Sequence, residues 1–563
     1  MDKFTRRDFL KGGAITAAAV AGAATVTALN GCTPGTTGTA AEAPKETEAW
    51  MPEKWDLETE ILIIGYGFAG ASAAIAANMQ GADALVLEVA PEELRGGNST
   101  ACGGGWVSVW DESLYLEHLQ KLCFHITPDN YLKDWVEADK GIIDWMDTLE
   151  IEHRQTVHNY SHFFTSDSVP IDPLTGNPAS GAVGDSGIDQ NRAIREDGEP
   201  ANGKDLHDML AQRVSDRGIR VMYETRGLAL FQNPNTREVL GCRAQDKEGK
   251  DIFIKATKGV LLCCGGYENS PELIDYHVMP GLRVYPAGSP FNRGDAIYMA
   301  GPVGADLWHM AGIEWLGLGV RINDDDQSTF SDFRGLNSGC IVNKSGERMY
   351  NEDMSLIHTK EFPPIYFKGF ADDPTSLCDF WGVPSFAVFD ETRRLAGNAG
   401  FYVTNNRQVM GFAVNHGLYE WSDDNSKEIE NGIIKRADTI RGLAEIAGIN
   451  PDALEETVNN FNEYATQGLD LEYGRTEMSP IVTPPFYSIE LVPTFINTQG
   501  GPKHSNLDCR CLDHDDNEIP RFYACGECGS VYSMLYHGSG NVAEAIITGK
   551  LAAENAAALE PWE

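Results

Sequence analysis

The strongest hydrophobic pattern in the chain is a short apolar run that ends at closely spaced glycines. Residues 61–64, Ile-Leu-Ile-Ile, predict a buried parallel strand, because such strands are apolar on both faces. The small-residue run 71–77 predicts a helix, and residues 84–87 predict a second strand that ends in Glu88. The order strand, glycine turn, helix, strand and acid predicts a βαβ unit.

Further elements follow along the chain. Residues 203–216 predict a helix, residues 219–223 a strand, and the apolar run 259–264 another buried strand. A last helix is expected from about Asn541 to Ala557.

The glycine turn at residues 65–70 is typical of a dinucleotide site. Its first glycine makes a tight turn, its second lets a pyrophosphate approach the backbone, and its third lets the helix pack against the strand. The helix N-terminus then faces the anion, and Glu88 is placed to bind a ribose hydroxyl. The predicted nucleotide contacts are Gly65, Gly67, Phe68, Ala69, Gly70 and Glu88.

A second glycine-rich stretch follows at residues 96–105. A loop of this composition suits an extended cofactor that lies against backbone amides. It adds Gly97, Asn98, Ser99, Gly104 and Gly105 to the predicted cofactor contacts.

The charge of the chain narrows the class of partner. The 563 residues include 44 Lys and Arg against 83 Asp and Glu, which gives a net charge of −39. Nucleic-acid binding needs a basic face, so this charge argues against a nucleic-acid partner. Broad docking on anionic lipid is disfavoured for the same reason.

The first 31 residues predict an export signal. Arg6 and Arg7 stand in Thr-Arg-Arg-Asp-Phe-Leu-Lys, ahead of a weakly apolar Ala, Gly and Thr run. This is the pattern that the Tat translocase reads, and the run is too weakly apolar for a membrane span. A disordered basic tail is the alternative.

Residues 29–32, Leu-Asn-Gly-Cys, are similar to a bacterial lipobox, so cleavage would leave Cys32 lipidated. Cleavage after Ala43 is the alternative. Residues 32–50 are rich in Pro, Gly, Thr and Ala, which predicts a flexible tether. The N-terminus therefore predicts an extracytoplasmic protein that is anchored to the membrane through Cys32.

The 12 cysteines are widely scattered, which favours mostly free thiols over a disulfide framework. Two groups have a spacing that could carry other chemistry, namely His504, Cys509, Cys511 and His514 for zinc, and Cys525 with Cys528 as a dithiol. The Asp-rich turn after Cys511 predicts a solvated loop, so we expect no metal site.

Several motifs together carry a resemblance to a known family. They are Gly97-Asn98-Ser99, Gly265-Gly266 after an apolar strand, Gly294-Asp295-Ala296, Asn343 to Glu352, Gly468 to Arg475, Tyr523 to Glu527 and Gly538 to Asn541. On these motifs residues 57–560 resemble the flavoprotein subunits of the fumarate reductase and flavocytochrome c family, which includes ketosteroid dehydrogenases.

The resemblance implies FAD as the cofactor and an α/β fold. It implies a discontinuous Rossmann-like FAD-binding domain, residues 51–300 and 491–563, with an inserted α+β substrate-capping domain at residues 301–490. Glu527 is expected to bind the ribityl chain, and the N-terminus of the last helix to face the flavin. The expected FAD contacts gain Gly265, Gly266, Asp295, Glu527, Asn541 and Val542.

Three positions depart from the fumarate reductases. In that family an arginine, a histidine and a second arginine handle the substrate carboxylates. The matching positions here are His537, Asn497 and Leu356, and His358, two residues further, could substitute. Fumarate or succinate as substrate is therefore not expected.

Residues 536–540, Tyr-His-Gly-Ser-Gly, are instead similar to a ketosteroid dehydrogenase segment whose tyrosine hydroxyl and glycine amide polarise a ketone oxygen. The resemblance implies Tyr536 and the Gly540 backbone as catalytic groups, with His537 or His358 as a proton donor. Structural roles for Tyr536 and for both histidines remain alternatives.

The expected function is an FAD-dependent oxidoreductase that reduces a carbon–carbon bond next to a carbonyl. The substrate would be a small enone or acrylate-type molecule, and the electrons would come from a separate cytochrome or flavoprotein. Desaturation of the ketosteroid type is one alternative, and a non-catalytic flavin electron-transfer subunit is another.

Overall fold

The computed structural model describes residues 50–160, 185–278, 280–322, 328–330, 337–352, 380–399, 403–404, 407–408, 411–533 and 536–563. The chain divides into two units, Met1–Lys54 and Trp55–Glu563, and the fold below is that of the second. The expected Tat signal and Cys32 lie outside the described residues, and of the expected tether only Trp50 is described.

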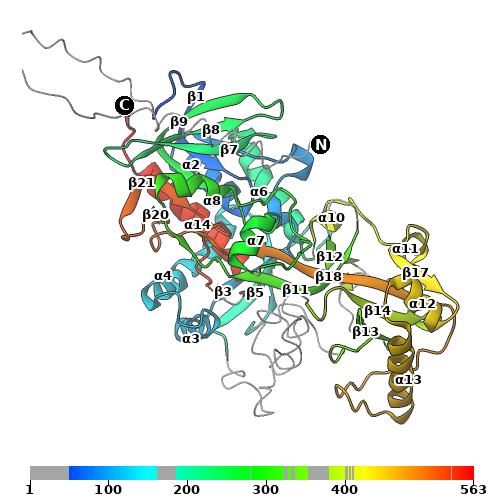
Figure 1. Cartoon of the computed structure of the whole chain (residues 1–563). Helices are drawn as coiled ribbons and strands as arrows, with labels where there is room; N and C mark the ends of the chain where they lie inside the picture. The colour runs from blue at the N-terminus through cyan, green and yellow to red at the C-terminus, as the bar shows by residue number, and fades with distance from the viewer. Residues whose placement is uncertain are drawn as a thin grey trace, which may run out of the picture. The chain divides into compact units, whose positions relative to one another are not determined.

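A mostly parallel sheet forms the larger layer of the second unit (Figure 1). Five neighbouring strands of this sheet, β21, β9, β1, β2 and β6, run parallel to one another, and β20 pairs antiparallel with β21 at one edge. The order across the sheet is β20 (Arg510–Leu512), β21 (Glu518–Ala524), β9 (Asp251–Leu262), β1 (Leu57–Ile64), β2 (Ala84–Leu87) and β6 (Arg220–Met222). The antiparallel strands β7 (Arg226–Gln232) and β8 (Val239–Gln245) continue from β9.

This sheet confirms the predicted α/β fold, in which distant parts of the chain form one sheet. β1 and β9 come from the first half of the chain, whereas β21 comes from the last 50 residues or so and pairs with β9. Helices α2 (Phe68–Met79) and α14 (Gly540–Ala557) pack closely, since a Cβ at Gly549 would lie 2.2 Å from the Ala69 carbonyl oxygen. The domain boundaries at residues 300 and 490 stay predictions.

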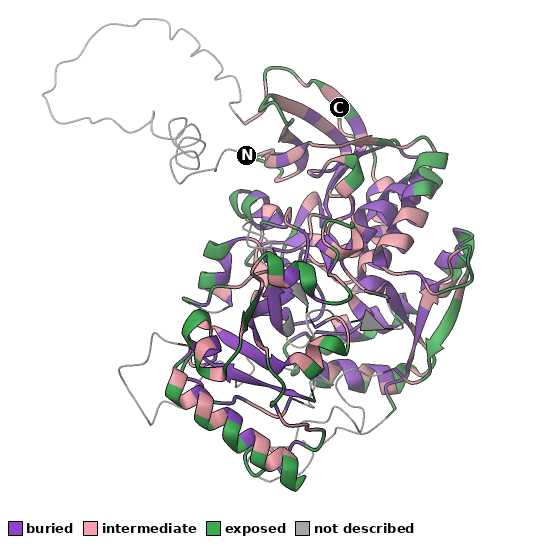
Figure 2. Cartoon of the chain, turned by 90° about the vertical axis from the view of Figure 1, so that its right-hand side faces the viewer, coloured by how far each residue is buried: buried purple, intermediate pink, exposed green. Residues whose placement is uncertain are grey.

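A second, antiparallel sheet lies under the helices of the middle of the chain. Its long strand β18 (Phe486–Thr498) pairs through its first half with β14 (Ser385–Asp390) and β17 (Ile434–Ala437). Through its second half β18 pairs with β11 (Ile313–Arg321). Figure 2 shows the buried residues of these strands. The strands are β11 (Ile313–Arg321), β12 (Ser328–Phe330), β13 (Gly339–Asn343), β14 (Ser385–Asp390), β17 (Ile434–Ala437) and β18 (Phe486–Thr498).

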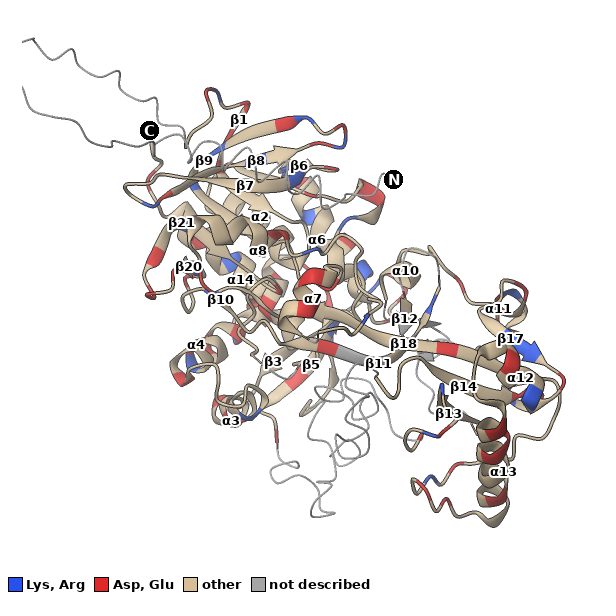
Figure 3. Cartoon of the chain, viewed as in Figure 1, with Lys and Arg blue, Asp and Glu red and all other residues tan. Residues whose placement is uncertain are grey.

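A long helix beside this sheet ends at a left-handed glycine. α13 (Pro451–Gln467) begins at the Asn450 cap and ends before Gly468, which is left-handed with φ 67°. Acidic residues follow one another along α13 (Figure 3), in line with the negative net charge. α12 (Ile440–Ala447) and α11 (Ser426–Glu430) precede it.

The motif at residues 343–352 is explained by a buried ionic network. Arg348 Nη2 lies 2.7 Å from Glu352 Oε2 and 3.1 Å from Asp470 Oδ2. Arg475 Nη1 lies 3.3 Å from the same Glu352 oxygen. All four side chains are buried, so this motif holds the second sheet to the end of α13 rather than contributing to the cleft.

A third sheet, with three helices beside it in the chain, contacts the segment at residues 536–540. The sheet order is β3 (Gly105–Val109), β5 (Ile188–Ala193) and β4 (His153–Val157), and the helices are α3 (Glu112–Leu122), α4 (Asp129–Asp139) and α5 (Ile142–Thr148). The other elements are α6 (Gly203–Asp216), α7 (Pro271–His277), α8 (Asp295–Ala300), β10 (Leu307–Trp308), α9 (Glu391–Leu395), β15 (Val403–Thr404), β16 (Arg407–Gln408), α10 (Phe412–Asn415), β19 (Gly501–Pro502) and the 3₁₀ helices Glu92–Leu94, Gly97–Thr100 and Gly301–Val303.

Most predicted elements have the predicted bounds to within three or four residues. The strand at 84–87 and the helix at 203–216 agree at both ends. The strand predicted at 259–264 is the exception, because β9 begins eight residues earlier, at Asp251, and ends at Leu262, before the turn at Gly265, where φ is 69°. Cys263 and Cys264 therefore lie beyond the strand, at its carboxyl end.

Within the described residues, no helix combines the length and the apolar character needed to span a bilayer.

Candidate active site

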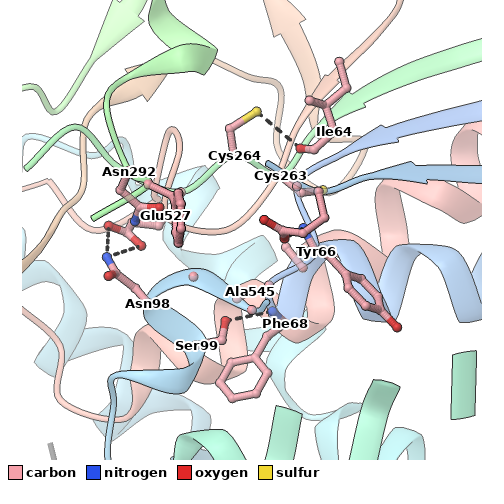
Figure 4. A pocket seen from close by; sticks show the side chains of 18 of the residues that line it. Ile64, Tyr66, Phe68, Asn98, Ser99, Cys263, Cys264, Asn292, Glu527 and Ala545 are labelled. Atoms are coloured by element: carbon pink, nitrogen blue, oxygen red, sulfur yellow. Dashed lines mark hydrogen bonds between the residues drawn. The ribbon is translucent and has the colours of Figure 1, made fainter. Parts of the chain in front are cut away.

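The carboxyl ends of β1, β2, β9 and β21 open onto one cleft (Figure 4), with an empty space of about 980 Å³ that is partly open to solvent. Ligands of open parallel sheets bind at this edge of the strands. Most of the predicted cofactor contacts line the cleft: Gly65, Gly67, Phe68, Ala69, Glu88, Gly97, Asn98, Ser99, Gly265, Asp295, Glu527, Asn541 and Val542.

Two glycines of the turn lack a side chain for different structural reasons. Gly65 has a φ of 107°, and a Cβ there would lie 2.1 Å from the Cys263 carbonyl oxygen, so it packs β1 against β9. Gly67 lines the cleft, and its nearest neighbour would be Ser99 Oγ at 3.0 Å. Gly67 thus leaves its backbone open toward the cleft, where the sequence predicts the approach of a pyrophosphate.

The four remaining predicted glycines lie behind the lining rather than in it. A Cβ at Gly70 would lie 1.9 Å from the Gly65 carbonyl oxygen, which makes Gly70 the packing glycine of the turn. A Cβ at Gly104 would meet the Asn202 backbone, one at Gly105 would meet Ser539, and one at Gly266 would meet Thr498. These glycines shape the walls of the cleft.

Two helix N-termini face the cleft. The Phe68 N–H at the start of α2 donates to Ser99 Oγ at 2.8 Å (Figure 4). The N-cap of α14 is Ser539, whose side chain makes no capping bond. Next to it, both polar atoms of the Asn541 amide are buried without a partner. Helix N-termini attract anionic groups, so α2 and α14 favour negative charge in the cleft.

Glu88 stands where the sequence places it, at the end of β2. Its Oε2 accepts from the Tyr66 N–H at 3.1 Å and its Oε1 from the Ala90 N–H at 2.8 Å. Burial raises the pKa of Glu88 to about 7, although these backbone donors oppose the rise. The carboxyl group therefore orders the turn while it lines the cleft.

Two further residues of the cleft, Arg226 and Asn292, were not predicted from the sequence. Arg226 is the first residue of β7 and makes a two-pronged ion pair with Asp295, in which Nε lies 2.8 Å from Oδ2. Asn292 lines the cleft, and its Nδ2 is buried without a partner. The position of Arg226 at the carboxyl edge of the sheet is the signal that could have identified it; Asn292 stands outside every motif.

The lining fits FAD on three observations of its own. The amide of Asn541, Nδ2 of Asn292 and Oδ1 of Asn497 are buried polar atoms without partners, and a ligand with donors and acceptors would satisfy them. Two helix N-termini suit a pyrophosphate, and Gly67 leaves room for its approach. The residues that would hold the cofactor are those of the lining named above, with Arg226 and Asn292 added.

The catalytic candidates separate in the structure. Tyr536 lines the cleft and is 8% exposed, and burial raises the pKa of its hydroxyl well above the ordinary value. The His537 ring lies among those of Tyr532, His118 and Tyr115, at centroid distances of 5.0, 5.4 and 5.7 Å, and is not part of the lining. His358 and Leu356 lie outside the described residues.

The Gly540 amide already has an acceptor. Its N–H donates to the His537 carbonyl oxygen at 2.9 Å, and Gly540 is not among the residues of the lining. A substrate oxygen would therefore have to share or displace this bond. Whether the Gly540 amide polarises a substrate carbonyl stays a prediction.

A polar wall continues from the 536–540 segment onto the third sheet. Gln190 Nε2 donates to Ser539 Oγ at 2.8 Å, and Ser539 Oγ donates to the Tyr160 hydroxyl at 3.4 Å. Arg192 is next but one to Gln190 on β5. Burial raises the pKa of both Cys102 and Tyr160, and the charge of Arg192 opposes this rise. No motif signals these residues, because β5 joins the wall only through pairing with β3.

The cysteine and histidine groups have structural surroundings. Both ring nitrogens of His504 lie within hydrogen-bond distance of carbonyl oxygens, those of Ser505 and Gly529. No group of three or more potential metal ligands occurs among the residues that the structure describes. The described cysteines are free thiols, as predicted.

Known proteins match this chain along nearly its whole length. Digoxin reductase of Eggerthella lenta is 28% identical, and the match covers 99% of this chain and 98% of that protein. The 3-oxosteroid 1-dehydrogenase of Mycolicibacterium smegmatis is 26% identical over 89% of this chain and 97% of that protein.

The fold agrees with these matches. The open conformation of a flavocytochrome c3 fumarate reductase superimposes with a TM-score of 0.65 at 21% identity, over 89% of this chain and 78% of that one. Residues 60–542 match the family described as FAD binding domain. The chain belongs to this FAD binding domain family and is an FAD-dependent oxidoreductase that acts on carbon–carbon bonds.

Proposed function

We propose that the protein is an exported reductase of a carbon–carbon double bond next to a neutral carbonyl, and that a separate redox protein supplies its electrons. The observation that carries the proposal is the position of Tyr536. It lines the same cleft as Glu527 and Asn541, and it is buried. A buried hydroxyl with a high pKa stays protonated and can donate a hydrogen bond to a substrate oxygen.

The chain's own residues bind and polarise in this proposal. Bound FAD supplies hydride transfer. Asn541, Asn292 and the backbone at Gly67 hold the cofactor. Tyr536 donates to the carbonyl oxygen of the substrate, where negative charge develops, and preorganised donors of this kind stabilise such charge.

The charges of the lining favour a neutral substrate. Arg226 is the one cation among the described lining residues, and Asp295 already neutralises it. Carboxylate binding normally uses arginine in a two-pronged bond, and Asn497 and His537 stand where related reductases carry charged groups. The relative named for digoxin, a neutral molecule, supports the same class of substrate.

Arg192 favours a second candidate, an acrylate-type carboxylate substrate. Its guanidinium has no hydrogen-bond or ion-pair partner in the described part of the chain, and a Cβ at Gly103 would lie 3.4 Å from its Nη2. It acts on Cys102 and Tyr160, whose own charges reach Tyr536. Arg192 is not among the residues of the lining, so a carboxylate held by it would lie near Cys102 and Tyr160 rather than deep in the cleft.

Two further alternatives are an enzyme that works in the opposite direction, as a dehydrogenase, and a protein that catalyses no reaction of its own. The relative that is a 3-oxosteroid 1-dehydrogenase supports desaturation as the alternative direction. A non-catalytic electron-transfer subunit would bind FAD but would leave Tyr536 without a substrate.

Export rests on residues 1–43. Arg6 and Arg7 support export by the Tat translocase, and Cys32 supports an extracytoplasmic, membrane-anchored protein. Replacing Arg6 and Arg7 together by Lys should retain the protein in the cytoplasm, and Cys32→Ala should release it from the membrane fraction. Unchanged fractionation of both variants would reject this part of the proposal.

Turnover with a set of acceptors tests the substrate class. The holoenzyme, supplied anaerobically with a reduced viologen dye, should consume electrons with a neutral enone and little with acrylate or fumarate. Arg192→Gln should leave enone turnover unchanged. If acrylate is the better acceptor and Arg192→Gln removes its turnover, the second candidate holds. If no enone or acrylate is reduced, the carrier alternative gains support.

A further inference from the structure

Two buried glutamates beside the cleft have no role in the site described so far. Glu268 follows the Gly265–Gly266 turn and is 3% exposed, and Glu314 stands on β11 and is 1% exposed. Burial of an ionised carboxylate is costly unless a cation or several donors compensate it. No ion pair joins Glu268 to a cation within the described residues.

Glu268 shares its hydrogen-bond donor with Glu527. Asn98 Nδ2 lies 2.8 Å from Glu268 Oε1, and 2.9 and 3.1 Å from the two oxygens of Glu527. Figure 4 shows the amide of Asn98 facing Glu527 at the edge of the cleft. One side-chain nitrogen with two hydrogens thus serves two carboxyl groups.

The remaining oxygen of Glu268 points toward the second carboxyl group. Glu268 Oε2 is buried and no hydrogen bond of good geometry reaches it, while the Asn292 amide and the Thr498 hydroxyl lie close enough to Glu268 to oppose the rise of its pKa. A Cβ at Gly266 would lie 2.7 Å from this oxygen, 2.5 Å from Glu527 Oε1 and 2.2 Å from the Thr498 hydroxyl oxygen, so the two carboxyl groups and this hydroxyl face the same point. Since like charges in one site oppose ionisation, a proton is the ligand that satisfies this arrangement.

Glu314 is the third member of the group. Its Oε2 accepts from Asn497 Nδ2 at 2.7 Å, and Asn497 lines the cleft together with Glu527 and Tyr536. The charge of Glu314 reaches Glu527 and Tyr536, and the charge of Glu268 reaches Glu314. The three glutamates therefore titrate as one system that borders the cleft.

The surroundings keep this system partly protonated. Burial raises the pKa of Glu268 to about 8. Burial, and then the charge of Glu268, raise the pKa of Glu314 and of Glu527. The other ionisable groups on which the three glutamates act are Tyr160, Tyr267, Tyr536, Cys102 and Cys528, all with raised pKa values, while Arg192 acts on Tyr160 and Cys102.

We propose that Glu268, Glu314 and Glu527 form a proton-binding site that takes up a proton from solvent when bound FAD gains electrons. Negative charge added to the cleft makes ionised carboxylates there less favourable, so one carboxylate becomes a carboxylic acid. The proton comes from water, and the electrons come from the reductant. The inference requires bound FAD but does not depend on the substrate class proposed above.

The pH dependence of the flavin midpoint potential tests the inference without any organic substrate. We expect the potential of the wild-type holoenzyme to fall more steeply with pH just above about 8 than below it. Below that pH the site is protonated in both redox states, and just above it reduction draws in the extra proton. An indicator dye in weak buffer should record that proton directly.

Variants assign the extra proton to this site. Glu268→Gln should remove the steep segment, and Glu314→Gln should move it to lower pH because a neighbouring carboxyl group is lost. Glu544→Gln is the matched control: Glu544 is also buried and its pKa is about 8, but it accepts from Ser530 and Val531 and acts on a different set of groups. The control should keep the steep segment.

Two results would overturn the inference. The first is a wild-type potential with one constant slope from about pH 6 to about pH 10. The second is a steep segment that survives in Glu268→Gln, or in Glu314→Gln at an unchanged pH if Glu268→Gln fails to bind FAD. Absence of enone turnover would reject the proposed substrate but would leave these titrations unaffected.

Discussion

The two ends of the cleft are built by different means. At the end formed by the 65–70 turn, backbone atoms form much of the surface of the cleft, and they come from one continuous stretch of chain. At the end around Tyr536, side chains from β5, β11, β18 and the segment before α14 meet from distant parts of the sequence. A local motif can specify the first arrangement, whereas only the folded chain specifies the second.

The largest effect should come from filling the backbone end. Gly67→Trp should abolish FAD binding, because Gly67 lines the cleft and its backbone must stay open to the cofactor. The bound flavin can be measured by its absorbance after gel filtration. Gly301→Trp is the control, since nothing lies within 4 Å of a Cβ there, and it should keep its flavin. A yellow Gly67→Trp protein would contradict the placement of FAD.

A smaller effect should come from Asn541, whose amide is buried and unsatisfied in the protein alone. Asn541→Ala should weaken FAD binding by roughly five- to tenfold, since a net hydrogen bond contributes about 1 kcal/mol. The same change should stabilise the FAD-free protein, because an unsatisfied buried amide is removed.

Asn425 provides the matched control for that prediction. Its side chain accepts from the Ala399 N–H and from Trp421 Nε1, and it donates to two carbonyl oxygens. Asn425→Ala should therefore lower the thermal midpoint of the FAD-free protein and leave FAD affinity unchanged. If both variants shift the thermal midpoint of the FAD-free protein equally, the amide of Asn541 is not an unsatisfied group that FAD binding would satisfy.

Glu88 should give the FAD-free protein a stability that depends on pH. Its pKa is about 7 in the folded protein and 4.5 in the unfolded chain. Between these pH values the folded state holds a proton that the unfolded chain has lost. The free energy of unfolding should therefore fall as pH rises, by up to about 3 kcal/mol.

Urea unfolding of the wild type and of Glu88→Gln at several pH values measures this contribution. The variant should lose most of the decline between about pH 4.5 and about pH 7, because it has no proton to release. Parallel curves for the two proteins would show that Glu88 is ionised throughout that range, and that its backbone donors outweigh its burial.

The same contrast explains what the sequence could and could not predict. The bounds of the helix at 203–216 and of the strand at 84–87 follow from hydrophobic period and local composition. Gly65, Gly67 and Glu88 are predictable because a dinucleotide site needs fixed spacing within one βαβ unit. The resemblance to a family extended this to Glu527 and Asn541 at the far end of the chain.

Side-chain direction and long-range pairing were beyond the sequence. Tyr536 and His537 are neighbours in the sequence. In the structure, however, Tyr536 lines the cleft, whereas the His537 ring packs among other aromatic rings outside the lining. Glu268 and Glu314 are 46 positions apart and meet only through the pairing of β11 with β18 and the end of β9. No spacing rule connects such residues.

Reoxidation of the reduced flavin in a single turnover tests the central claim most directly. Reduced holoenzyme is mixed anaerobically with a neutral enone, in the wild type, in Tyr536→Phe and in Tyr532→Phe, whose hydroxyl is buried outside the cleft lining. We predict that Tyr536→Phe slows reoxidation about a hundredfold to a thousandfold with its flavin content unchanged, while Tyr532→Phe keeps the wild-type rate. Equal rates in wild type and Tyr536→Phe, or reoxidation by fumarate as fast as by the enone, would contradict a neutral-carbonyl site built on Tyr536.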